Sequence, residues 1–310
     1  MYALNASQAM ISRKEMRESL LRSGYLLESR LETVLRKNGY YVETNAAFPD
    51  AESGKSRELD AYAMSAVSAG REERDFVFAV LLIECINNPQ PVAFITKDPQ
   101  VAFLHYEEVK LAGIPVKIPI EGQRDSWESL PYFLGMDKYH HYCRGRIATQ
   151  YCSFAQKKNL QEWMASHDDA HFDAFKKVCA AAEHYISAHF KSWVFNGREN
   201  INVEFYYPIV IFQGQLIDVR LGRETLALTR ADHVQFRRSA FVGEQEVDYQ
   251  IDVVTERFFP KFLKIVENEQ TKTARLMKQR QKKVRKAIST IVRRAKRLRS
   301  PEKIRETMEF

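Results

Sequence analysis

Two hydrophobic periods alternate along the first 120 residues of the chain. Apolar residues from Leu27 to Leu35 share one face of a predicted helix over 25–37, and Gly39 ends it. Residues 75–85 form a continuous apolar run between turn residues, which predicts a central strand covered on both faces. Further strands are predicted at 40–48, 57–67, 91–97 and 115–120, with a helix near 99–112. This order of elements predicts an α/β unit with a mixed sheet.

The rest of the chain adds helices, then strands, then one long helix. Residues 125–195 have a helical pattern, and residues 202–254 return to strands. From 257 the pattern predicts a single helix towards residue 299, ended by Ser300 and Pro301. We therefore expect an α/β core with a central mixed sheet flanked by helices, a helical and β-rich elaboration, and a long basic C-terminal helix. The predicted boundaries are 1–124 for the core, 125–256 for the elaboration of the same or an adjoining domain, and 257–310 for the helix and tail.

Composition narrows the class of protein. A hydrophobic content of 45% supports a folded core, and the longest apolar run, residues 76–83, is too short to span a membrane. No long apolar stretch opens the chain, so we expect a soluble cytoplasmic protein without a membrane partner. The four cysteines form no CxxC pair, which argues against a zinc site or a disulfide framework.

Three carboxylates lie on the predicted core: Glu28 on the first helix, Asp60 on the strand 57–67, and Glu84 at the end of the central strand. Adjacent strands bring side chains of like facing within about 5 Å, so Asp60 and Glu84 are expected to meet at one end of the sheet. Two buried carboxylates repel each other unless a cation lies between them. Oxygen ligands suit Mg²⁺ or Mn²⁺, which we predict as the cofactor. Alternatively, an Arg partner neutralises Glu84, and Glu28 lies in solvent.

These residues and their contexts resemble the restriction-endonuclease-like superfamily, the PD-(D/E)xK phosphodiesterases. Glu28 lies in GYLLESRLETVLRKNGYYV, Asp60 in SGKSRELDAYA and Glu84 in LLIECINN, and the resemblance covers roughly residues 20–120. It implies that Asp60 and Glu84 bind the metal ion and that the backbone carbonyl of Cys85 adds a ligand. It also implies that Glu28 completes the site. The implied activity is metal-dependent endonuclease cleavage of phosphodiester bonds, in DNA in preference to RNA.

The chain departs from the family pattern at the lysine of the ExK motif, where Ile86 stands. In the family, that lysine orients or deprotonates the attacking water and stabilises charge in the transition state. Ile86 can do neither, because it has no charge and no hydrogen-bond donor. Lys97, at the end of the next strand, is the predicted substitute, with Lys55 and Arg57 as further candidates. The alternative is a catalytically inactive nuclease fold that binds nucleic acid or acts as a scaffold in a larger complex.

Positive charge is concentrated near the C-terminus. Residues 271–299 contain thirteen Lys or Arg and no Asp or Glu, and subtracting these charges from the net charge of +7 leaves −6. Such a segment is typical of a polyanion-binding surface, and nucleic acid is the partner we expect. The predicted nucleic-acid contacts are Lys278, Arg280, Lys282, Lys283, Arg285, Lys286, Arg293, Arg294, Lys296 and Arg297. A heptad-like stripe that includes Val284, Ile288 and Ile291 also allows a partner helix or a homodimer, and anionic lipid is a further alternative.

A basic and aromatic cluster surrounds His140 and His141. Tyr139, Tyr142 and Arg144 belong to it. Such a mixture suits phosphate contacts and base stacking, and it equally suits packing between elements.

Overall fold

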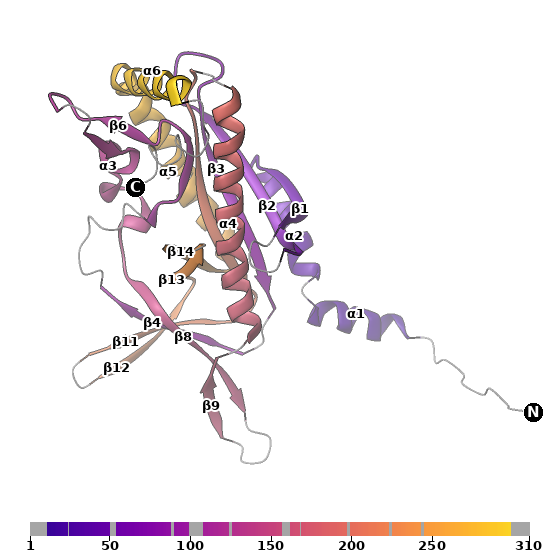
Figure 1. Cartoon of the computed structure of the whole chain (residues 1–310). Helices are drawn as coiled ribbons and strands as arrows, with labels where there is room; N and C mark the ends of the chain where they lie inside the picture. Colours follow the sequence, from indigo (N-terminus) through magenta and orange to yellow (C-terminus); the bar gives the residue numbers. More distant parts are fainter. Residues whose placement is uncertain are drawn as a thin grey trace, which may run out of the picture.

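The computed structural model describes residues 11–23, 25–49, 54–87, 90–98, 108–123, 126–156, 162–167, 169–196, 199–222, 225–242 and 245–298 (Figure 1). Its helices are α1 (Arg13–Arg22), α2 (Tyr25–Lys37), α3 (Leu130–Leu134), α4 (Asp169–Asn196), α5 (Phe259–Gln279) and α6 (Gln281–Leu298), with short helices η2 (Met136–Lys138) and η3 (His141–Cys143). Its strands are β1 (Tyr41–Pro49), β2 (Ser56–Ser68), β3 (Phe76–Ile86), β4 (Val92–Lys97), β5 (Leu111–Ile114), β6 (Lys117–Pro119), β7 (Trp127–Ser129), β8 (Ile147–Gln156), β9 (Trp163–Ser166), β10 (Asn202–Phe212), β11 (Leu216–Leu221), β12 (Leu226–Ala231), β13 (His233–Val242) and β14 (Gln245–Thr255).

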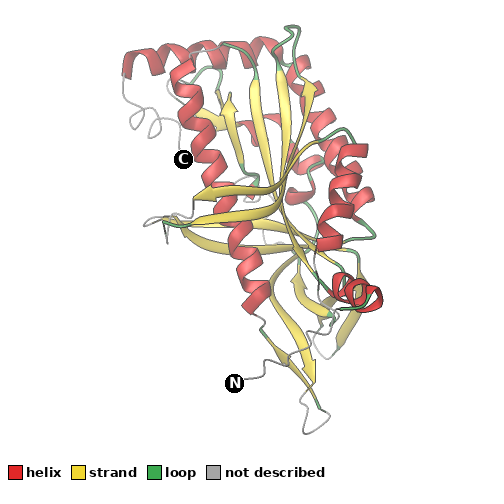
Figure 2. Ribbon diagram, turned by 90° about the vertical axis from the view of Figure 1, so that its right-hand side faces the viewer, coloured by secondary structure: helices red, strands yellow, loops and turns green. Residues whose placement is uncertain are grey.

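One mixed sheet joins twelve of the described strands. Their order is β1-β2-β3-β10-β14-β13-β8-β4-β11-β12, with β5 paired to β10 and β9 paired to β8. The strands β1, β2 and β3 form an antiparallel meander, and β10 and β14 then run parallel to β3. Strands from the predicted core and from the predicted elaboration therefore share one sheet. The expected α/β fold, with a large mixed sheet flanked by helices, is confirmed (Figure 2).

Helices cover both faces of this sheet. On one face, Leu27 and Leu31 of α2 and Phe262 of α5 share a buried core with the strands. On the other face, Phe175 and Val178 of α4 belong to a second core. The strand β3 contributes alternate residues to the two cores, which explains its continuous apolar run. No helix in the described ranges is long and apolar enough to cross a bilayer.

Two predictions for the middle of the chain differ from the structure. The end of the helix predicted at 99–112 is wrong, because Leu111 begins β5, which pairs with β10; residues 99–107 lie outside the described ranges. The helical prediction for 125–195 is wrong at three places: residues 127–129 and 163–166 form the short strands β7 and β9, and residues 147–156 form β8 between β13 and β4. The helical part of that segment is mainly α4, whose length of 28 residues lets it follow the sheet from end to end.

The single helix predicted from 257 is two helices, α5 and α6. They separate at Arg280, whose φ of −99° and ψ of 21° depart from helical values. The break lets α6 turn across the end of the sheet while α5 runs along it (Figure 1).

The helix α6 packs on the body through its apolar face. Val284, Ile288 and Ile291 are buried and belong to the same core as α2 and α5. Arg285, beside them, pairs with the fully buried Asp75 just before β3. In the described part of the heptad-like stripe, Val284, Ile288 and Ile291 therefore fill the protein's own core and are not available to a partner helix. The side chains of Ala295 and Leu298, which complete the stripe, lie outside the described residues.

Candidate functional site

Asp60 and Glu84 face each other across β2 and β3. They lie one residue beyond the last paired residues of these strands, Ala61 and Ile83. The Oε1 atom of Glu84 accepts a hydrogen bond from the backbone N–H of Asp60 at 3.3 Å. The Oδ2 atom of Asp60 accepts one from the backbone N–H of Cys85 at 2.6 Å. The register of an antiparallel pair thus brings the two carboxylates to one place on the sheet.

A lysine from helix α4 reaches this pair. The Nζ atom of Lys177 lies 2.6 Å from Oε2 of Glu84 and donates to the carbonyl oxygen of Glu58 at 3.1 Å. Glu28 of α2, on the other face of the sheet, is also close to this group: burial and the charge of Asp60 raise its pKa, and Lys177 acts in the opposite direction. Three carboxylates and one ammonium group therefore converge between α2 and α4.

Burial and mutual repulsion disfavour the ionised carboxylates. Burial, followed by the charge of Asp60, raises the pKa of Glu84 to about 8, although Lys177 acts in the opposite direction. Burial also raises the pKa of Asp60, against the Cys85 N–H and Lys177. Burial and Asp60 raise the pKa of Glu28. The single positive charge of Lys177 therefore does not neutralise the three carboxylates. A bound cation would favour their ionised forms.

Replacing Glu84 with Gln is expected to stabilise the metal-free protein at alkaline pH. Between the ordinary value of 4.5 and about 8, the unfolded chain has released the Glu84 proton while the native protein retains it. Wild-type stability therefore falls as pH rises through this window, whereas a Gln side chain does not titrate. The gain of Glu84→Gln over wild type should grow by about 2–4 kcal/mol from pH 4 to pH 9.

Urea unfolding in EDTA across this pH range measures the effect. Glu267→Gln is the matched control, because Glu267 is half exposed and its ion pair is with Lys264 on the same helix. A difference between Glu84→Gln and wild type that does not change with pH would contradict the raised pKa. Added Mg²⁺ or Mn²⁺ is expected to reduce the advantage of the variant, since a cation removes the repulsion that the variant relieves.

Lys97 does not reach the carboxylates. It is the exposed last residue of β4, which pairs with β8 and β11. The strands β10, β14, β13 and β8 separate β4 from β3 in the sheet. The expectation that β4 lies next to β3 is therefore wrong, because strands from the second half of the chain pair with β3 first. Lys177, rather than Lys97, is the basic group beside Glu84.

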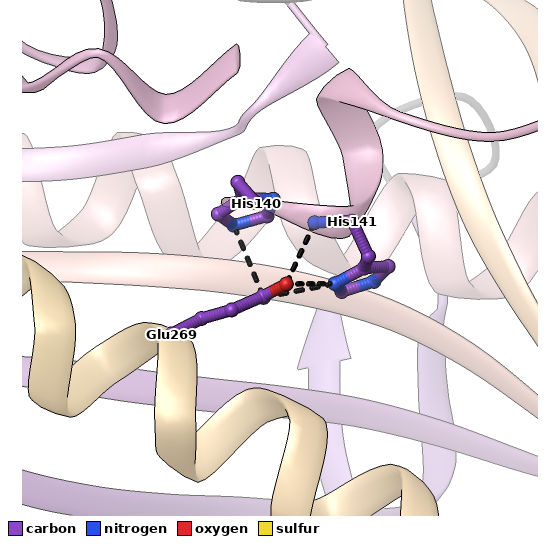
Figure 3. Close-up of side chains that lie close together, drawn as sticks. All are labelled: His140, His141 and Glu269. Atoms are coloured by element: carbon purple, nitrogen blue, oxygen red, sulfur yellow. Dashed lines mark hydrogen bonds and ion pairs between the residues drawn. The ribbon is translucent and has the colours of Figure 1, made fainter. Parts of the chain in front are cut away.

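A second cluster of ionisable groups lies in the core, between β14, α5 and the turn at η3. Figure 3 shows His140 and His141 from this turn converging on Glu269 of α5. The Nδ1 atom of His141 lies 2.8 Å from Glu269 Oε2, and its Nε2 atom lies 3.1 Å from each carboxylate oxygen of Asp252. The Nε2 atom of His233 lies 2.7 Å from Oδ1 of the same Asp252. Packing between elements, one of the two interpretations of the His140 segment, therefore explains why His140 and His141 lie in the core.

The ionisation of this cluster is set by its two carboxylates. Burial opposes a charge on His141, but Asp252 and Glu269 outweigh it and raise the pKa of His141 to about 10. Burial lowers the pKa of His140 to about 4. Burial acts against the charge of Asp252, but His141 and His233 hold the pKa of this carboxyl well below its usual range. An imidazolium of His141 between two carboxylates is the arrangement that these shifts describe.

The same cluster could hold a metal ion. The ligand atoms of His140, His141 and Glu269 all lie within 4.8 Å of one another. Two imidazoles and a carboxylate suit a transition metal better than Mg²⁺. However, the backbone N–H of Tyr142 donates to Nδ1 of His140 at 3.2 Å, which leaves the proton of a neutral His140 on Nε2, the atom facing Glu269. The predicted Mg²⁺ or Mn²⁺ site at Asp60, Glu84 and the Cys85 carbonyl is a separate place and stays a prediction.

The basic residues predicted to bind nucleic acid divide into two groups. Among the described side chains, four make contacts within the protein: Arg285 with Asp75 and Glu72, Arg280 with the carbonyl oxygen of Phe133, Arg294 over the ring of Trp127, and Lys283 with Glu121. The other four are exposed and have no ion pair with a described residue: Lys278, Lys282, Lys286 and Arg293. The side chains of Lys296 and Arg297 lie outside the described residues.

The position of Lys177 beside the apolar stripe of α4 is visible in the sequence, but the hydrophobic period of the helix does not by itself identify this lysine as a site residue. Buried Ala174, Val178 and Ala181 form the sheet-facing stripe of α4, and Lys177 borders this stripe at helical spacing. A lysine beside an apolar stripe has a long stem that can lie along the core while its ammonium group reaches a carboxylate. For the cluster around His141, only the adjacent histidines stood out, because their partners come from β14 and α5.

A scan against protein-family models matched none, and searches of curated proteins and of solved structures found no significant match.

Proposed function

We propose that this chain hydrolyses phosphodiester bonds with a divalent cation held by Asp60 and Glu84. The observation that carries the proposal is the position of Lys177, whose Nζ atom lies 2.6 Å from Glu84 Oε2. Phosphodiester cleavage needs acidic ligands for the cation and a separate positive group for the developing charge. Lys177 supplies from α4 the group that Ile86 cannot supply from β3.

Each residue has a role that follows from its chemistry. Asp60 and Glu84 offer oxygen ligands, and the Oδ2 atom of Asp60 is oriented by the Cys85 N–H. A bound Mg²⁺ or Mn²⁺ would polarise the phosphate and lower the pKa of its water. Lys177 is placed to orient the attacking water or to stabilise the negative charge that develops on the phosphate. Glu28, with its raised pKa, supports the site from α2.

The restriction-endonuclease-like fold is part of the same proposal. The helix α2, the meander β1–β2–β3, the helix α4 and the parallel strand β10 form one continuous unit around the carboxylates. The segment from β4 to β9 comes between β3 and α4 in the chain. The proposal treats the segment from β4 to β9 as an insertion. The role of the ExK lysine then passes from position 86 on β3 to Lys177 on α4, the helix that follows this segment. Nucleic acid, with DNA preferred to RNA, is the proposed substrate.

The test is cleavage of plasmid and single-stranded DNA in the presence of Mg²⁺ or Mn²⁺. Asp60→Ala and Glu84→Ala are expected to lower the rate by at least about 100-fold, because each removes a ligand of the catalytic cation. Asp98→Ala is the matched control, since Asp98 is an exposed carboxylate in an ion pair with Arg146. Equal residual activity in wild type and both site variants would indicate a contaminant and defeat the proposal.

An inactive nuclease fold is the second candidate, and Ile86 is the observation that favours it. In that case Lys177 serves only to neutralise the buried Glu84. Salt-dependent binding of nucleic acid without metal-dependent cleavage would favour this function over hydrolysis.

A further inference from the structure

The exposed face of α6 carries a straight row of polar side chains. Lys282, Lys286, Ser289 and Arg293 are all exposed and follow one another at i, i+4, i+7 and i+11, the spacing of a single helix face. The opposite face, which includes Val284 and Ile288, is buried in the core. The row is about 16 Å long at 1.5 Å per residue. We call Lys282, Lys286 and Arg293 the α6 basic row.

The three charges of this row are exposed, and none of them forms an ion pair with a residue that the structure describes. Within the described ranges, no carboxylate lies at ion-pair distance from Lys282, Lys286 or Arg293. The nearby Glu121 pairs with Lys283 instead, at 3.1 Å. Arg285 pairs with Asp75 and so fixes α6 on the body rather than adding to the row. The exposed face of α6 therefore presents three positive charges to a partner.

The α6 basic row and the candidate catalytic site lie at opposite ends of β3. Arg285 anchors α6 to Asp75, the residue before β3 begins, and Glu84 lies nine residues further along the strand. Nine residues of strand span about 30 Å. Figure 1 likewise places α6 across one end of the sheet, with α2 further along it. Because the row lies on the exposed face of α6, a ligand that touches both places must be at least about 30 Å long.

We propose that the α6 basic row is a remote phosphate-binding surface, and that the substrate is a nucleic-acid duplex long enough to reach it from the catalytic site. At 3.4 Å per base pair, this distance corresponds to about nine base pairs. The inference rests on the proposed function and adds a requirement on substrate length to it. Contacts with the phosphate backbone of nucleic acid confer affinity without sequence specificity.

The triple substitution Lys282→Gln, Lys286→Gln and Arg293→Gln tests this inference, because Gln keeps helix propensity and removes three charges. Binding of a DNA hairpin with a 24-base-pair stem is measured in the Asp60→Asn background, without metal, at several salt concentrations. Loss of three phosphate contacts should lower the slope of log affinity against log salt by about 2.7 and weaken binding roughly 100-fold at 0.1 M salt. The matched control, Lys37→Gln with Lys138→Gln and Lys261→Gln, removes three exposed charges elsewhere and should keep the wild-type slope.

Cleavage separates this inference from the proposed function. In the active protein, the triple substitution should lower kcat/KM at least tenfold on the 24-base-pair stem and much less on a six-base-pair stem, which is too short to reach both places. Equal losses on the two stems, or no loss on either, would overturn the remote contact while leaving the hydrolase intact. Absence of cleavage by wild type on every stem would defeat the proposed function. The salt dependence of binding, measured without metal, would still show whether the α6 basic row contacts the duplex. A row that binds vesicles of anionic lipid but leaves duplex binding unchanged would also overturn the inference.

Discussion

Lys177→Met is expected to lower metal-dependent cleavage by about 100- to 1,000-fold, the usual effect of removing one preorganised group that stabilises charge in a transition state. Lys177 is the basic group that the structure places on Glu84, and Met keeps most of the length and packing of its stem. Rates are compared at saturating and limiting substrate, because a group that acts in the transition state lowers kcat and not only affinity.

Lys97→Met is the matched control for this experiment. Lys97 was the lysine expected from the sequence, and the structure separates its strand β4 from β3 by four others. Its removal should change the rate less than twofold or threefold. A larger loss with Lys97→Met than with Lys177→Met would contradict the assignment of Lys177. Thermal unfolding at pH 5 checks the fold, since Glu84 is protonated there, with or without its lysine partner.

Asp252→Ala is expected to lower the free energy of unfolding by about 3–5 kcal/mol, as for other buried ion pairs that lose one member. Asp252 is fully buried and accepts hydrogen bonds from His141, His233 and the hydroxyl of Tyr142. Its removal leaves these donors in the core without their shared acceptor. The turn at η3 and the hairpin of β13 and β14, which are far apart in the sequence, would lose their common contact.

The loss should depend on pH in a defined direction. The pKa of His141 is raised from 6.5 to about 10, so its contribution to stability is complete below 6.5 and is lost as pH rises through 10. Urea unfolding at pH 6 and pH 10 is therefore expected to show a larger difference between wild type and Asp252→Ala at pH 6. Asp98→Ala, in an exposed ion pair, should cost less than about 1 kcal/mol. An equally small effect of Asp252→Ala would show that the network does not stabilise the fold.

The sequence alone determined the local elements that carry the acidic residues. The helix 25–37 and the strands around Asp60 and Glu84 appear in the structure nearly as predicted, as α2, β2 and β3. Their hydrophobic period depends on residues within a few positions of each other, and such short-range patterns can be read directly. The pairing of Asp60 with Glu84 followed from two strands that are consecutive in the chain and antiparallel in the sheet.

Only the tertiary structure decided which basic groups meet these elements and what α6 covers. Lys177 reaches Glu84 because β10 pairs with β3 and brings α4 onto the sheet, whereas β4, the strand that follows β3 in the chain, lies elsewhere. The apolar stripe of α6 has a period that fits a partner helix as well as the protein's own core. The break at Arg280 and the pairing of Arg285 with Asp75 direct it inward. These contacts join residues distant in the chain, and no local period records which distant partner a side chain will meet.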